Sequence, residues 1–305
     1  LRMADEGQIV RCYHGNGELR QEVRYRDGVA HGVWRGWYRT GELEFEEYWE
    51  NGKLNGVHTS WFENGSKRDE GKWVDGNKDA DWICWAEDGR KLTENHWKDG
   101  VKHGPQITMH ANGETKERVY YSNGAMDGSY VSWFENGTQK ISGQFENGEK
   151  SGVWVEWFLT GDKKSERSYK DGQWTSWYRT GQKEFEGPVK KGLEDGIWTY
   201  WNADGDKVGE GQWVAGEKNG PWRHWYSSGV LKSEGTFQNG SENGLSTQWF
   251  ANGQKKREGE WVDGKEHGKW TSWYESGSLR YEYDYKDGKW HGTRRSHFDN
   301  GLLES

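Results

Sequence analysis

Residues 32–46 read GVWRGWYRTGELEFE, and this short stretch contains the pattern that recurs along the chain. Its turn residue, Gly41, belongs to a series of glycines spaced 24 residues apart, with one step of 20 residues between Gly161 and Gly181. A second glycine lies 11 residues after each of these, usually with Asn or Asp before it. Because Asn-Gly and Asp-Gly accept positive φ and favour hairpins, each period predicts two turns joined by short strands.

The segments between the turns are short and rich in β-branched and aromatic residues, as in residues 57–62 (VHTSWF). They predict an all-β fold, an elongated single-sheet antiparallel β-meander of about twelve 24-residue hairpin repeats that forms one array over residues 1–305. Irregular units are expected near 77–115, where Ala80 replaces a turn glycine, and near 172, where four residues are deleted. We expect a bend or an altered groove at both places.

Tryptophan follows the same period, because 22 of the 23 tryptophans lie seven before, four before or eight after a turn glycine. Residues two or four apart share one face of a strand, so the columns seven and four before the glycine lie on opposite faces. The column four before the glycine is a candidate binding surface, the Trp ladder, and consists of Trp37, Trp61, Trp85, Trp133, Trp157, Trp177, Trp201, Trp225, Trp249 and Trp273.

An acidic column lies five residues after the turn glycine. If this Asn-Gly turn has two residues, cross-strand pairing places the column on the same face as the Trp ladder. The candidate binding residues in this Glu column are Glu46, Glu70, Glu94, Glu166, Glu186, Glu210, Glu234 and Glu258. Two interpretations of the ladder stay open: stacked aromatics that form the core, or a groove that holds an extended partner.

The period, the turn residues and the aromatic columns together resemble the MORN (membrane occupation and recognition nexus) family, specifically its bacterial repeat variant, in the unit Gly32 to Glu46. The resemblance covers nearly the whole chain. It implies a binding or scaffolding protein, with antitoxin-like and immunity-like proteins among the family, and it implies no catalytic residues. The Trp-x-x-Trp-aromatic order departs from the better-known eukaryotic form, so membrane or phosphoinositide binding is not carried over.

The composition limits the choice of partner. Only 31% of the residues are hydrophobic and 30% are charged, but 15% are aromatic, which indicates an aromatic core and not a disordered chain. The formal net charge is −8, with 42 basic and 50 acidic residues and no basic block. Nucleic acid is therefore not an expected partner, and an anionic membrane is disfavoured.

No pattern in the sequence predicts catalysis, a cofactor or a metal site. His31 and the three other histidines of its column precede a turn glycine and are interpreted as turn residues. Cys12 and Cys84 lie three periods apart, roughly 30 Å, which predicts free thiols. The glycine-rich segments lack the strand-to-helix context of a phosphate loop, and we expect no enzyme.

The leading hypothesis is a non-enzymatic repeat protein that binds another protein, as a scaffold or as an antitoxin-like or immunity-like neutraliser. One alternative is a cell-wall or glycan-binding repeat protein, because sugar rings stack on indoles. Another is a structural filament whose subunits associate head to tail through open strand ends. A cytoplasmic location is favoured, and an extracellular one would require a signal peptide removed before residue 1.

Overall fold

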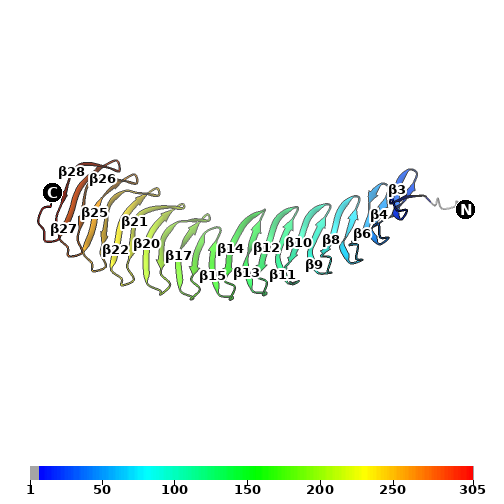
Figure 1. Ribbon diagram of the computed structural model, residues 1–305, viewed down its shortest axis with the longest axis horizontal. Coiled ribbons are helices and arrows are strands. Elements are labelled where there is room, and N and C mark those ends of the chain that lie inside the picture. The colour runs from blue at the N-terminus through cyan, green and yellow to red at the C-terminus, as the bar shows by residue number, and fades with distance from the viewer. Residues whose placement is uncertain (1–6, 305) are drawn as a thin grey trace. The chain divides into compact units, whose positions relative to one another are not determined.

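The computed structural model describes residues 7–304, and Figure 1 shows strands and turns throughout this range. The chain forms two units, which are considered separately: the first ends at Lys150 and the second begins at Ser151. In each unit, successive strands pair antiparallel as hairpins. The predicted all-β hairpin meander is confirmed. The described residues contain no helix long and apolar enough to cross a membrane.

The first unit contains β1 (Gln8–Tyr13), β2 (Leu19–Arg26), β3 (Val29–Trp37), β4 (Leu43–Glu50), β5 (Lys53–Leu54), β6 (Gly56–Trp61), β7 (Lys67–Val74), β8 (Asn77–Trp85), β9 (Lys91–Lys98), β10 (Val101–Met109), β11 (Thr115–Ser122), β12 (Ala125–Trp133) and β13 (Gln139–Glu146). The next strand is β14 (Glu149–Trp157).

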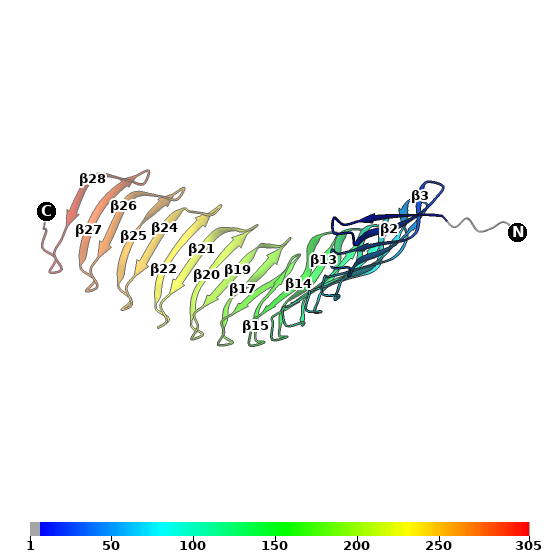
Figure 2. The ribbon, with the colours of Figure 1, turned by 45° about the vertical axis from the view of Figure 1, so that its right-hand side comes forward.

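The second unit continues with β15 (Lys163–Ser168), β16 (Gly172–Trp177), β17 (Lys183–Lys190), β18 (Leu193–Glu194), β19 (Gly196–Trp201), β20 (Lys207–Val214), β21 (Glu217–Trp225), β22 (Leu231–Gln238), β23 (Ser241–Glu242), β24 (Gly244–Trp249), β25 (Lys255–Val262), β26 (Lys265–Trp273), β27 (Leu279–Lys286) and β28 (Lys289–Ser296). Figure 2 shows these hairpins following one another in chain order.

The two glycine series close different turns. Asp27 and Gly28, with φ of 50° and 77°, form a two-residue turn between β2 and β3, as mirror-image hairpin turns require. Gly41 lies in a five-residue turn after Trp37, in which the Tyr38 amide donates to the Glu42 carbonyl and the Gly41 amide donates to the Tyr38 carbonyl. The first glycine series therefore does not meet the condition of a two-residue turn on which the expected cross-strand pairing was based.

The wider turn has a physical cause in the strand register. Arg35 lies opposite Glu46, as the two-residue turn predicted, but the register shifts between Gly36 and Trp37. This β-bulge pairs Trp37 with Leu43 and leaves five residues to close the turn. The Glu column consequently still shares a face with the Trp ladder, although the turn is of another kind.

The core lies on the opposite face, which we call the core face. The column seven before the turn glycine supplies its most buried side chains, at 2–5% exposure: Trp82, Trp154, Trp198, Trp222 and Trp270. Trp82 meets Trp73 edge to face, with ring centroids 5.1 Å apart. Its ring also covers Gly71, six residues after a turn glycine, where an added Cβ would overlap the indole. Gly187, Gly211 and Gly259 of the same glycine column meet tryptophan rings in the same way.

The irregular units keep the strand pairing. Gln106 occupies the tryptophan column in β10 and is 5% exposed. Its Nε2 donates to the carbonyl of His96 at 2.7 Å, as the indole of Trp82 donates to the carbonyl of Lys72 at 3.1 Å. The side-chain amide of Gln106 thus makes the same hydrogen bond to the neighbouring strand that the indole makes elsewhere in this column, but it provides no aromatic ring. The deletion near 172 shortens both β15 and β16 to six residues.

Candidate functional site

The Trp ladder occupies the face opposite the core, which we call the ladder face. Each of its ten tryptophans, from Trp37 to Trp273, ends a strand immediately before a five-residue turn, and all ten are half-buried. They are neither closed into the core nor fully open to solvent. The ladder therefore fits neither a fully buried aromatic core nor a fully exposed groove.

Lysines from the preceding hairpin cover many of the ladder rings. The Nζ of Lys207 lies 4.8 Å from the ring centroid of Trp225, and that of Lys67 lies 5.8 Å from that of Trp85. The same contact joins Lys163 to Trp177, Lys183 to Trp201 and Lys255 to Trp273. These cation–π contacts shield the five indoles from part of the solvent.

The Glu column is ion-paired along its whole predicted length. Lys91 contacts Glu94 at 2.8 Å, three residues away on the same strand, because the bulge brings both side chains to the ladder face. Lysines likewise pair with Glu70, Glu166, Glu186, Glu210 and Glu258, and arginines pair with Glu46 and Glu234. The column presents neutralised pairs to solvent.

Side chains of the five-residue turns connect each repeat to the next. The hydroxyl of Tyr38 donates to the carbonyl of Trp61 at 2.8 Å, and Tyr226 donates to Trp249 at 2.9 Å. Asn64 donates through Nδ2 to the carbonyl of Glu87 at 3.1 Å. These bonds hold successive ladder tryptophans at a constant spacing within each unit.

Aliphatic side chains eight residues before the turn glycine form a second column on the ladder face, which sequence reasoning missed. This aliphatic row is exposed by 39–63% and consists of Ile9, Val33 and Val57 in the first unit and Val153, Ile197 and Leu245 in the second. The alignment that found the tryptophan columns contains the signal, since these positions recur at the same offset.

The residues paired with the aliphatic row differ between the units. In the first unit, Val33 lies opposite Tyr48 and Val57 lies opposite Lys72. Ile9 lies opposite Arg24. In the second unit the corresponding partners are Ser168 opposite Val153, Gln212 opposite Ile197 and Glu260 opposite Leu245. The row is therefore flanked by basic and aromatic groups in the first unit and by neutral or acidic groups in the second.

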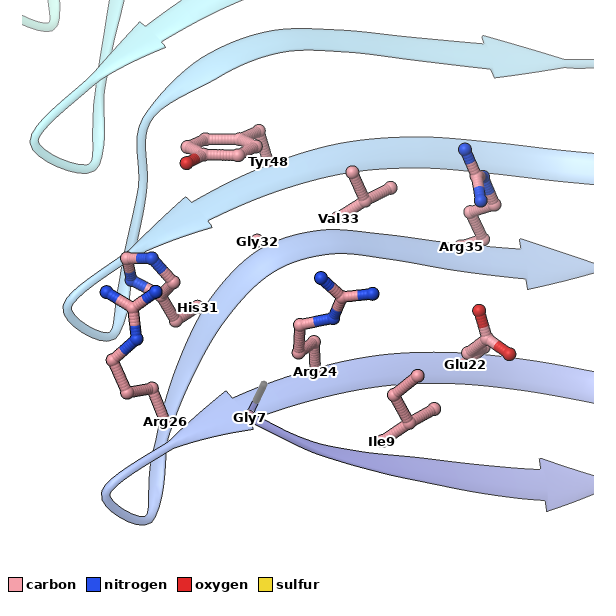
Figure 3. Close-up of a pocket in the computed structure, with 10 residues that line it drawn as sticks. All are labelled: Gly7, Ile9, Glu22, Arg24, Arg26, His31, Gly32, Val33, Arg35 and Tyr48. Atoms are coloured by element: carbon pink, nitrogen blue, oxygen red, sulfur yellow. The ribbon is translucent and has the colours of Figure 1, made fainter. Parts of the chain in front are cut away.

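An arginine hollow of about 440 Å³ opens at the start of the row in the first unit (Figure 3). It is lined by Gly7, Ile9, Glu22, Arg24, Arg26, His31, Gly32, Val33, Arg35 and Tyr48. Arg35 is held by Glu46 at 2.6 Å, and Glu22 is held by Arg11 at 2.7 Å. Among residues 7–304, no carboxylate pairs with Arg24 or Arg26, and the buried Nδ1 of His31 has no hydrogen-bond partner.

A separate charged cluster replaces one core tryptophan. His58 bonds to Asp69 at 2.8 Å and to Glu47 at 3.1 Å, and it stacks on Trp82. Burial lowers the pKa of His58, but the hydrogen bonds and charges of the two carboxylates outweigh it and raise the pKa to about 9. The histidine is thus a fixed cation inside the aromatic stack, and we assign it a structural role.

Four segments, residues 30–51, 170–191, 218–239 and 266–287, match the family model of the MORN repeat variant. The chain contains MORN repeats of this variant type. Each matched segment contains one ladder tryptophan at the end of a strand, as Trp37 ends β3 before the turn to β4. The columns described above extend the same pattern to the hairpins between the matched MORN repeats.

Further comparisons add no functional argument. No curated protein matches the sequence. Among solved structures, chains in the crystal structures of TcdB2-TccC3-Cdc42 and TcdB2-TccC3-TEV align with 96% of this chain at 9% and 12% identity. Their TM-scores are 0.19 and 0.18, and this chain spans 20% and 19% of their lengths. Likeness at these scores supports no statement about activity or partner.

Proposed function

We propose that this MORN-repeat chain is a non-enzymatic protein-binding module that holds a partner protein against its ladder face, as a scaffold or as an antitoxin-like or immunity-like neutraliser. The observation that carries the proposal is the aliphatic row, in which Val57, Ile197 and Leu245 are each more than 60% exposed at equivalent positions. Exposed apolar surface that is rimmed by polar residues is typical of protein interaction sites.

The rest of the ladder face fits the anatomy of a protein interface. Half-buried indoles lie beside the row, and ion pairs such as Lys207–Glu210 surround them, which gives an apolar centre with a polar rim. The core face offers no such surface, because Trp198 and Trp270 are 2% exposed there. Repeat proteins characteristically bind partners over extended surfaces of this kind.

The test uses the full chain with Ile197→Asp and Leu245→Asp together, compared with a control that carries Leu159→Asp and Leu193→Asp. All four positions are 47–63% exposed, but the control pair lies outside the row, Leu159 in a turn and Leu193 in the short strand β18. Each chain is crosslinked in extract of its source cells, and the retained proteins are quantified by mass spectrometry.

We expect at least one protein to be retained by the natural chain and by the control, and to fall about tenfold with the row variant. Equal retention by both variants would contradict the proposal. Recovery of glycan alone, or of further copies of this chain alone, would favour the glycan-binding or filament alternatives instead.

A further inference from the structure

The spacing of the aliphatic row selects the conformation of a bound peptide. In the first unit, Ile9, Val33 and Val57 lie in β1, β3 and β6, so a second strand separates each from the next. Neighbouring strands lie about 4.8 Å apart, which places successive row residues roughly 9.6 Å apart. A partner chain that follows the row must present one apolar side chain at each such interval.

Only one regular backbone matches this interval. A polyproline II helix has three residues per turn and rises about 3.1 Å per residue, so every third side chain recurs after roughly 9.3 Å on one face. An extended strand brings side chains to one face about every 6.7 Å, and an α-helix turns every 5.4 Å. Two turns of an α-helix span about 10.8 Å, so both the strand and the helix depart further from the row's interval than polyproline II does.

The charges beside the row select an acidic segment. Arg24 and Lys72 lie opposite Ile9 and Val57, and Arg26 extends the same basic side at the arginine hollow. None of these three cations has a carboxylate partner among residues 7–304. Arginines without a partner in a hollow favour a planar oxyanion, since a guanidinium can bind a carboxylate through two parallel hydrogen bonds.

The hollow also favours a peptide over a free anion. Its lining includes the aliphatic side chains of Ile9 and Val33 and the ring of Tyr48, which is 40% exposed. Figure 3 shows Val33 and Tyr48 on neighbouring strands above Arg24. An occupant must therefore bring an apolar group beside its carboxylate, and aromatic surfaces are where polyproline II segments dock.

We propose that the ladder face of the first unit binds an acidic peptide segment in polyproline II conformation, with an aliphatic residue at every third position against Ile9, Val33 and Val57 and a carboxylate in the arginine hollow. This inference rests on the proposed function and adds the conformation and charge of the partner segment.

The probe is a fluorescein-labelled peptide of four Leu-Pro-Glu repeats, titrated against the full chain by fluorescence anisotropy. One control peptide has the same composition in an order without the three-residue period, and another has Lys in place of Glu. We expect the period-three acidic peptide to bind at least about tenfold more tightly than either control. Equal binding of the reordered peptide overturns the conformation, and equal binding of the Lys peptide overturns the charge.

Variants of the chain locate the binding. Arg24→Glu and Val57→Asp should each weaken binding of the acidic peptide about tenfold, whereas the exposed turn variant Arg39→Glu should preserve most of it. Arg24→Lys keeps the charge but loses the two parallel hydrogen bonds, so it should weaken binding by less than Arg24→Glu does. Because all of these side chains except that of Arg39 lie on the ladder face, an equal loss with Arg39→Glu would indicate non-specific attraction and overturn the site.

Competitors separate the peptide from other anions. We expect millimolar inorganic phosphate and phosphatidylserine vesicles to leave peptide binding unchanged within about twofold. If the chain instead binds vesicles in a way that depends on Arg24 and does not bind the peptide, the proposal is overturned. If the peptide fails while a cellular partner still depends on Ile197 and Leu245, the proposed function stands and only the peptide inference is wrong.

Discussion

A glycine and an indole form the smallest unit of the core. At Gly259, an added Cβ would overlap the ring of Trp270, whereas at Gly235 it would meet only Ser246, at 3.4 Å from Oγ. Neither glycine has positive φ, so alanine introduces no backbone strain at either position, and the two substitutions differ only in packing. We predict that Gly259→Ala lowers the free energy of unfolding by about 1–3 kcal/mol, through overpacking against a rigid ring.

The same substitution at Gly235 should be neutral or slightly stabilising, because alanine limits the unfolded chain more than glycine does. Urea unfolding of both variants, followed by circular dichroism, measures the difference. Equal losses at the two positions would show that the glycine column does not exist to admit the tryptophan rings.

The cluster around His58 predicts a pH dependence. The pKa of His58 is about 9 in the folded chain and 6.5 ordinarily, so its contribution to stability is complete below pH 6.5 and is lost as pH rises to 9. Burial raises the pKa of Asp69, but its bonds to His58 and Ser60 lower it to about 2 overall, so its contribution is present above pH 3.8 and is lost as pH falls to 2.

Stability of this region should therefore be highest between about pH 4 and 6.5 and fall by about 2 kcal/mol toward pH 9. His58→Gln should remove the alkaline decrease, while His224→Gln should leave it unchanged, because burial and nearby lysines lower the pKa of His224. Urea midpoints at pH 6.5 and 9 provide the measurement, and an alkaline decrease that survives His58→Gln would refute this assignment.

At the scale of the elements, the sequence predicts the strands, their register and the face of each column, but not the kind of turn. Asn or Asp precedes most glycines of both series, so the two series have a similar turn signal. The difference depends on the bulge at Trp37 in the first of these turns. The equivalent bulge at Trp61 brings Lys67 and Glu70 together, a pairing that simple alternation of side chains would not predict.

The sequence predicts which face of the sheet carries the candidate site, but it does not predict how exposed the side chains of that face are. The alignment places the Trp ladder correctly on the face opposite Trp82, yet its partial burial depends on lysines from the preceding hairpin, such as Lys207 over Trp225. The aliphatic row was present in the same alignment. Its exposure, 62% at Val57, could not be told from the alignment, because that depends on which side chains pack beside it in the folded chain.

Ala80 offers a test of turn chemistry. It has a φ of 57° at a position where other repeats have glycine at positive φ, and the left-handed region costs an L-residue about 1–2 kcal/mol. We predict that Ala80→Gly raises the free energy of unfolding by about 1 kcal/mol. The reverse change, Gly268→Ala, meets no neighbour within 4 Å and should lower it through backbone strain alone.

Thermal and urea unfolding of both variants check this pair. A loss of stability with Ala80→Gly would mean that the methyl group of Ala80 contributes packing that outweighs its strain, and the irregular unit near 77–115 would then have a local structural purpose.

At the scale of the whole molecule, stability is assembled from contacts between neighbouring repeats. The rings that surround Trp222 belong to Tyr200, Trp213, His224 and Phe237, and its indole donates to the carbonyl of Gln212 at 3.1 Å. All of these partners lie within one repeat of Trp222. The stability of such an array is approximately the sum of contributions from each repeat and from its contacts with the neighbouring repeats.

Trp222→Ala therefore should act locally. Removing an indole that is 3% exposed should cost about 3–5 kcal/mol, and amide hydrogen exchange should accelerate in β19–β24 while β2–β9 keep their protection. Trp290→Ala, at a ring that is 62% exposed, should change exchange little and is the control. Uniform acceleration over all strands would instead show a chain that unfolds as one cooperative unit. A local response would mean that a partner bound along the ladder face stabilises only the repeats it contacts.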